Sequence, residues 1–93
     1  MTCTLDVPPE IKVQFSKLLK RDRTLFDRVM KKISEIQEKP TQMGSPKKFN
    51  LKGARGVHIG SFVLVWAPIP PVNPEIVKIL LFEHHDDAYN ESY

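Results

Sequence analysis

The sequence has 93 residues, 41% of them hydrophobic and 27% charged, an ordinary balance for a soluble globular protein that leaves no room for a second lobe. We therefore expect a single domain over residues 1–93. No apolar stretch approaches the roughly 20 residues that span a membrane, and the first residues lack the pattern of a secretory signal. A lone cysteine excludes an intramolecular disulfide and cannot by itself build a zinc site. These observations favour a cytoplasmic protein without a membrane partner.

Positive charge is concentrated in the first part of the chain. The formal net charge is +3, but residues 1–53 hold twelve Lys and Arg against six Asp and Glu, whereas residues 54–93 hold two against five. A basic half of this kind favours an anionic partner such as nucleic acid. Charge alone leaves open the alternative that two solvated helices produce the asymmetry by chance.

The first forty residues predict a strand and two helices. Residues 2–7 alternate between apolar and polar, as a half-buried strand does, and Pro8-Pro9 ends this strand and begins a helix. Apolar residues then recur at helical spacing over residues 11–19 and again over residues 26–36. The two helices are expected to form an antiparallel hairpin because their junction is short.

The second predicted helix has recognisable ends. It is expected to begin near residues 22–24, where Thr24-x-x-Asp27 resembles a capping box. Lys39-Pro40 should end it, because a residue that precedes proline is disfavoured in the α conformation. A loop rich in glycine, proline and lysine is then expected over residues 41–53.

The remainder predicts three strands. Residues 55–59 alternate in hydropathy, Gly60-Ser61 marks a tight turn, and residues 62–66 form an apolar run rich in β-formers. The prolines that follow, beginning with Pro68, predict a stiff connection outside any central strand. Residues 76–82 are apolar on both faces, as expected of an interior strand. The chain therefore predicts an α+β fold of two layers: an N-terminal strand, a helical hairpin, and an antiparallel three-strand meander that completes the sheet.

Several residues have side chains suited to binding or proton transfer. Lys47, Lys48, Lys52 and Arg55 form a basic cluster that could contact phosphates or could be a solvated loop. His58 lies on the polar side of its predicted strand, where it is a bystander or a proton-transfer group, since imidazole titrates near neutral pH.

The end of the last strand contains the segment His84-His85-Asp86-Asp87. Successive strand residues point to opposite faces, so the two histidines cannot readily bind one ion, and we expect no metal site and no cofactor. One of the histidines is instead expected to point into a cleft near Tyr89. Tyr89 could equally be a structural residue that packs the tail.

The order of these segments resembles the RelE/ParE superfamily of type II toxin–antitoxin toxins. The resemblance spans nearly the whole chain and depends on order and spacing, because each motif is short. The matching segments are Leu51-Lys52-Gly53, Arg55-Gly56-Val57-His58-Ile59-Gly60, Ser61-Phe62-Val63-Leu64-Val65-Trp66 and Phe82-Glu83-His84-His85-Asp86-Asp87-Ala88-Tyr89.

The resemblance implies a RelE-like toxin that enters the ribosome and cuts mRNA without a metal ion, held inactive by an antitoxin in a hetero-oligomeric complex. In such a reaction the 2′-hydroxyl attacks the adjacent phosphate, which requires cations around the developing charge and groups that accept and donate protons. Lys47, Lys48, Lys52 and Arg55 would then hold phosphates of the RNA. His58, His85 and Tyr89 would be the catalytic residues.

The sequence departs from the family at four positions where basic residues are expected. Gly56 and His58 stand where strand cations are expected, Val63 stands where the next strand has an Arg, and His85 takes the place of the terminal Arg. Two alternatives to an active nuclease follow. One is a ParE-like inhibitor that binds DNA gyrase and has no catalytic activity, and the other is a weakened toxin that only binds its antitoxin.

Overall fold

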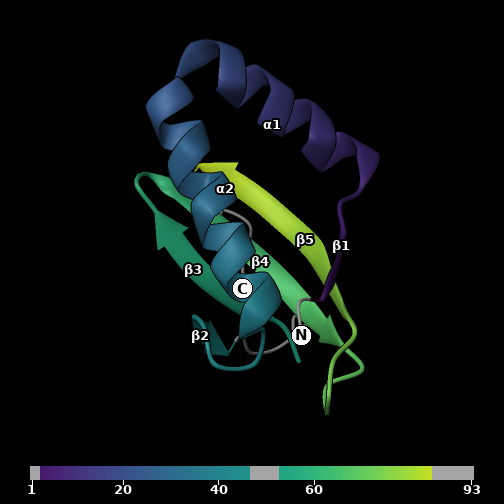
Figure 1. Cartoon of the computed structure of the whole chain (residues 1–93). Helices are drawn as coiled ribbons and strands as arrows, with labels where there is room; N and C mark the ends of the chain where they lie inside the picture. Colours follow the sequence, from purple (N-terminus) through teal and green to yellow (C-terminus); the bar gives the residue numbers. More distant parts are fainter. Residues whose placement is uncertain (1–2, 47–52, 85–93) are drawn as a thin grey trace.

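The computed structural model describes residues 3–46 and 53–84, and within them two helices pack on one sheet (Figure 1). The elements in chain order are β1 (Thr4–Asp6), α1 (Pro9–Arg21), α2 (Arg23–Glu38), β2 (Ser45–Pro46), β3 (Arg55–Ile59), β4 (Phe62–Ile69) and β5 (Ile76–His84). The strands lie in the order β1-β5-β4-β3-β2. The α+β fold and the antiparallel meander β3-β4-β5 predicted from the sequence are confirmed.

The sheet as a whole is mixed rather than purely antiparallel. β1 pairs in parallel with β5, with Thr4 opposite Ile76, and every other neighbouring pair of strands is antiparallel. Parallel neighbours need a long crossover connection, and α1 and α2 lie in the chain between β1 and β5. The strand predicted over residues 2–7 is thus present as a short edge strand.

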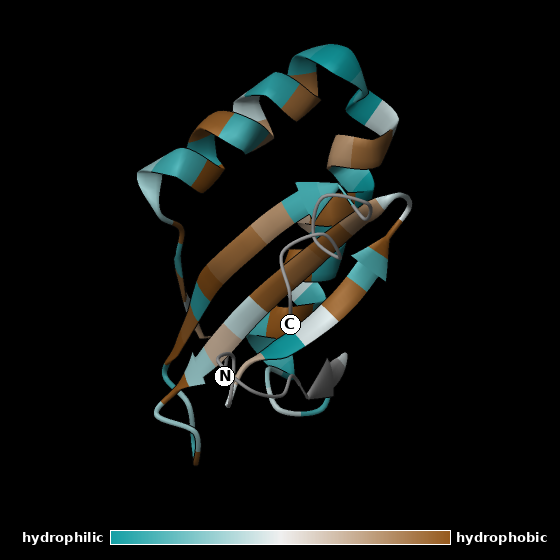
Figure 2. Ribbon diagram, turned by 180° about the vertical axis from the view of Figure 1, so that it is seen from behind, coloured by the Kyte–Doolittle hydropathy of each residue, from teal (hydrophilic) through white to brown (hydrophobic). Residues whose placement is uncertain are grey.

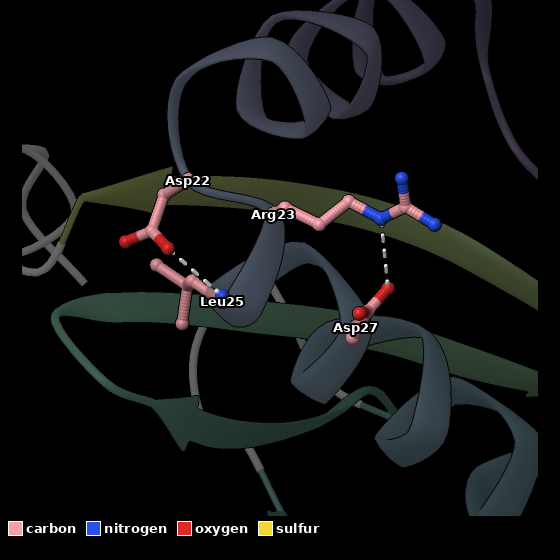
Figure 3. Close-up of polar contacts among 4 residues, drawn as sticks. All are labelled: Asp22, Arg23, Leu25 and Asp27. Carbon is pink, nitrogen blue, oxygen red and sulfur yellow. Dashed lines mark hydrogen bonds and ion pairs between the residues drawn. The ribbon is translucent and has the colours of Figure 1, made fainter.

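Asp22 separates the two helices and caps the second one. Its Oδ1 accepts a hydrogen bond from the Leu25 backbone N–H at 3.0 Å (Figure 3). Its own N–H donates to the Leu18 carbonyl at 2.8 Å. The predicted capping box at Thr24 is therefore wrong, because the N-cap of α2 is Asp22, two residues earlier, and Thr24 lies in the first turn of the helix. Asp27 instead lies 3.7 Å from the Arg23 Nε in an exposed i,i+4 pair.

The main core lies between the helices and one face of the sheet. α2 crosses that face and α1 runs beside β5 (Figures 1 and 2). Fully buried side chains from both layers meet there, including Val29 and Ile36 of α2 and Leu64, Trp66 and Ile79 of the sheet. A smaller apolar cluster occupies the opposite face, which we call the outer face; its described members are Ala54, Val63, Val65, Leu80 and Leu81.

β4 is longer than the sequence predicts. It continues through Pro68 to Ile69, whereas a proline there was expected to exclude a central strand. The pairing explains the difference: β3 reaches only as far as Arg55 opposite Trp66, and Pro68 is paired on the β5 side alone, with Val77. β4 is thus an edge strand at Pro68, where a missing N–H costs no ladder hydrogen bond.

Candidate functional site

His58 lies on the outer face of the sheet. Its neighbours along β3, Val57 and Ile59, pack in the main core under the helices, so the alternation of β3 directs His58 to the opposite side. The side chain is exposed, and its cross-strand partner is Val63 of β4, a member of the outer-face cluster. The exposed position of His58 agrees with the prediction that His58 lies on the polar side of its strand.

The centre of the outer face is apolar beside His58. Val63, at the position where the family resemblance implies an arginine, is only 2% exposed. Gly56, at another expected basic position, lies opposite the fully buried Val65. Neither β3 position 56 nor β4 position 63 therefore supplies a cation, and any phosphate bound here must be neutralised by side chains from elsewhere in the chain.

Arg55 lies on the other face of β3 from His58 and holds the segment that follows α2. Its Nε donates to the Met43 carbonyl at 2.6 Å, and its Nη2 donates to the Gly44 carbonyl at 3.0 Å. Gly44 has a φ of +68°, and a Cβ there would lie 2.7 Å from the Trp66 ring. The indole Nε1 of Trp66 in turn donates to the Pro40 carbonyl at 3.1 Å. Arg55 and Trp66 thus fix the path of the chain from α2 into β2, inside the segment predicted as an irregular loop.

The other predicted site residues lie outside the described residues; they are Lys47, Lys48, Lys52, His85 and Tyr89. β5 ends at His84, whose cross-strand partner is Phe62 of β4. Phe62 is also the cross-strand partner of Ile59 of β3. The chain therefore leaves β5 at the end of the sheet where His58 is located. Within residues 3–46 and 53–84, no group of three or more His, Cys, Asp or Glu side chains is placed to hold a metal ion. Neither described helix is long and apolar enough to cross a membrane.

A wide groove opens on the helix side of the sheet, and no pattern in the sequence predicts it. It has a volume of about 870 Å³ and lies between the C-terminal half of α1, the start of α2 and the ends of β4 and β5. We call it the α1–β5 groove; its lining residues are Gln14, Lys17, Leu18, Arg21, Asp22, Leu25, Phe62, Phe82, Glu83 and His84.

Aromatic rings occupy the sheet side of this groove. Phe62 and Phe82 stack with ring centroids 4.8 Å apart, and Phe15 of α1 meets Phe82 edge to face at 5.0 Å. The His84 imidazole meets Phe62 edge to face at 5.6 Å. His84 therefore lines a cleft on the face opposite His58. The prediction that one histidine of the pair points into a cleft near Tyr89 involves a residue outside the described part of the chain.

The sequence contains only a weak signal that the residues lining the groove lie close together. Lys17 and Arg21 are four residues apart and flank the buried Leu18, so they belong to one border of the apolar stripe of α1. Their position beside the end of β5 depends on the crossover that brings α1 next to that strand. Helical periodicity alone cannot specify that contact.

Comparison with known proteins places the chain in a family. No family model matches it. Over 88 residues the chain is 31% identical to a protein of Methanocaldococcus jannaschii that has the provisional name toxin RelE4, a match that covers 94% of this chain and 90% of that protein. The chain belongs to the RelE-like superfamily of toxins from toxin–antitoxin modules.

Solved structures share the fold at lower identity. A YoeB/ParE toxin from Agrobacterium tumefaciens has a TM-score of 0.77 at 12% identity, covering 88% of this chain and 98% of that one. An arginine-to-alanine mutant of E. coli toxin RelE in the free state has a TM-score of 0.72 at 20% identity, covering 99% and 95%. The toxin of the RelBE2 toxin–antitoxin complex from Mycobacterium tuberculosis has a TM-score of 0.70 at 19% identity, covering 90% and 99%.

Proposed function

We propose that this toxin is a ribosome-dependent endoribonuclease that cleaves mRNA on its outer face and so inhibits translation in the cytoplasm. The observation that supports the proposal is the position of His58, an exposed imidazole on the face opposite the helices. It lies at the same end of the sheet from which β5 leads to His85. RNA cleavage by the 2′-hydroxyl needs a base, an acid and cations around one phosphate.

Each predicted site residue has a role in this proposal. His58 and His85 exchange protons with the 2′-hydroxyl and the leaving 5′-oxygen, and Tyr89 assists as a donor. Lys47, Lys48 and Lys52 bind phosphates of the mRNA. Arg55 was predicted in the same set, but its guanidinium is held by two backbone carbonyls on the other side of β3, so we assign it to positioning the chain between α2 and β3.

A second candidate function is inhibition of DNA gyrase without catalysis. Two observations favour it: Gly56 replaces one expected cation, and Val63 replaces another with a buried apolar side chain. Loss of these cations would weaken stabilisation of the charged transition state, which is often the largest catalytic contribution. A toxin with this surface could still bind a protein target.

We also propose that a cognate antitoxin binds this toxin and that the two form a hetero-oligomer. The support is the family assignment together with the solved RelBE2 toxin–antitoxin complex, whose toxin has the same fold. The basic excess of residues 1–53 suits an acidic partner.

The test is primer extension on mRNA incubated with translating ribosomes and the purified toxin. We expect discrete cleavage that needs ribosomes and that is lost in His58→Ala. The control is Lys78→Ala, which removes an exposed side chain of β5 opposite Ala67, four residues along β4 from Val63, the cross-strand partner of His58. A parallel gyrase supercoiling assay should show no inhibition. Gyrase inhibition without mRNA cleavage would replace the nuclease proposal by the second candidate.

A further inference from the structure

The turn between β3 and β4 lies against the start of α2. Gly60 has a φ of +59°, and a Cβ built on it would lie 3.1 Å from a methyl carbon of Leu25 and 3.8 Å from the Nη1 of Arg28. Leu25 and Arg28 are three residues apart in the helix, so they are neighbours on its surface. Because Gly60 has no side chain, α2 can approach the turn closely, and the Arg28 guanidinium lies beside the backbone of the sheet.

The Arg28 guanidinium has no partner in the described part of the chain. Arg28 is exposed, and it takes part in no ion pair within residues 3–46 and 53–84. The neighbouring Asp27 is paired with Arg23 instead, at 3.7 Å from the Arg23 Nε. The N–H donors of Arg28 are therefore available to an anion, and the planar guanidinium suits bidentate binding of a phosphate.

Arg28 and His58 lie on opposite sides of the same end of the sheet. His58 precedes Gly60 by two residues and is directed to the outer face, whereas Arg28 reaches the turn from the helix side. Two residues of β-strand extend for about 7 Å, which is close to the length of one nucleotide in an extended single strand. A strand of RNA that crosses the β3–β4 turn can therefore place one phosphate at His58 and the next one at Arg28.

A cation at the turn would compensate in part for the basic side chains that the strands lack. Val63, the cross-strand partner of His58, is buried and uncharged, and Gly56 has no side chain. A fixed positive charge one nucleotide from the reacting phosphate cannot replace a cation in direct contact with it. Such a charge does hold the RNA in the position from which the 2′-hydroxyl attacks, and positioning of this kind contributes strongly to catalysis.

We propose that Arg28 binds the mRNA phosphate next to the scissile one, so that the RNA crosses the β3–β4 turn from the outer face to the start of α2. The inference rests on the proposed nuclease function and adds to it the path of the substrate. Arg28 is a substrate-binding residue in this account, whereas His58 transfers protons.

The first part of the test measures ribosome-dependent cleavage of unmodified mRNA by toxin variants that circular dichroism shows to be folded. We expect Arg28→Ala to lower kcat/KM by at least about 10-fold, as loss of a hydrogen-bonded charged contact does. Arg28→Lys should retain part of the rate, because lysine keeps the charge without the planar fork. The control is Arg23→Ala, which removes an exposed arginine of the same helix that is paired with Asp27, and its rate should stay within about 3-fold.

The second part identifies the phosphate that Arg28 contacts. An uncharged methylphosphonate replaces the phosphate on the 5′ or the 3′ side of the scissile one. At one of these two positions the replacement should slow the unmodified toxin and Arg23→Ala by at least about 10-fold. It should slow Arg28→Ala by less than about 3-fold, because that variant has already lost the contact.

Three results would overturn the inference. One is cleavage of unmodified mRNA by Arg28→Ala at the unmodified rate, and another is an equal loss of rate in Arg28→Ala and Arg23→Ala, which would show a general charge effect. The third is a lower rate in Arg28→Ala while the methylphosphonates slow all three proteins equally, which would assign Arg28 to a contact with the ribosome. These results leave the nuclease proposal intact, whereas the absence of any ribosome-dependent cleavage by the unmodified toxin would contradict that proposal itself.

Discussion

His58 and Val63 are cross-strand partners on the outer face of the sheet, one exposed and the other buried. The imidazole thus stands at the border of an apolar cluster where the family resemblance implies a second cation. Because Val63 supplies no charge, the proposed cleavage on this face would depend on proton transfer by histidine more than on fixed charges of the strands. The chemistry proposed for this toxin follows from this pair.

Val63→Arg should not simply restore the missing cation. Val63 is 2% exposed and packs with Val65 and Ala54, so a guanidinium must either be buried or displace this cluster. We expect the free energy of unfolding to fall by at least about 2 kcal/mol, as burial of a charged group without a partner does. Urea denaturation measures the change, and Val63→Ile is the apolar control. A variant as stable as the unmodified protein would show that the outer face is open enough to admit a charged side chain.

Arg55→Lys should destabilise the fold although it conserves charge. The ammonium group cannot reproduce the two hydrogen bonds that the guanidinium donates to Met43 and Gly44, because Lys lacks the planar fork. We expect a loss of about 1–2 kcal/mol in the free energy of unfolding. Lys78→Ala, at an exposed position of β5, should change it by less than about 0.5 kcal/mol. If Arg55→Lys keeps full stability but loses RNA affinity, Arg55 contacts phosphate as the sequence alone suggested.

Two aspartates on either side of the start of α2 should differ in their effect on stability. Asp22→Ala removes the oxygen that accepts from the Leu25 N–H and should cost about 1 kcal/mol. Asp27→Ala breaks only the exposed pair with Arg23 at 3.7 Å and should cost less than about 0.5 kcal/mol. Thermal denaturation of the two variants makes the comparison, with Asp22→Asn expected to retain most of the stability because its side-chain oxygen can still cap the helix. A larger loss in Asp27→Ala would reinstate the capping box at Thr24.

The sequence predicted the order of elements well because each one has a strong local pattern. The apolar stripe of α2 and the two-residue alternation of β3 are such patterns, and both elements are present with the expected buried faces. The β3–β4 turn at Gly60, which has a φ of +59°, is likewise predictable from its residues.

The sequence predicted less well those features that depend on tertiary contacts between distant parts of the chain. Pro68 continues β4 because β3 has already ended. The phosphate-binding role of Arg55 stays a prediction, and the pleat places its guanidinium on the opposite side of the strand from His58. The α1–β5 groove combines residues of three regions of the chain, and no local pattern could indicate that they meet.

The pH dependence of cleavage distinguishes a histidine site from an arginine site. If His58 and His85 act as base and acid, cleavage needs one imidazole neutral and the other protonated, so the rate should pass through a maximum and fall on both sides of it. An arginine-based site does not titrate in this range, because guanidinium stays protonated. His85→Arg should flatten one limb of the profile while preserving positive charge, and His85→Ala should lose both functions.

The most direct test of the proposed mechanism is the rate of ribosome-dependent mRNA cleavage by the unmodified toxin and His58→Ala between about pH 5 and 9. Lys78→Ala serves as the folded control, and circular dichroism confirms that each variant is folded. We predict a bell-shaped profile for the unmodified toxin and for Lys78→Ala, and a rate lower by at least about 100-fold in His58→Ala. Cleavage by His58→Ala at the unmodified rate throughout this range would contradict a catalytic role for His58.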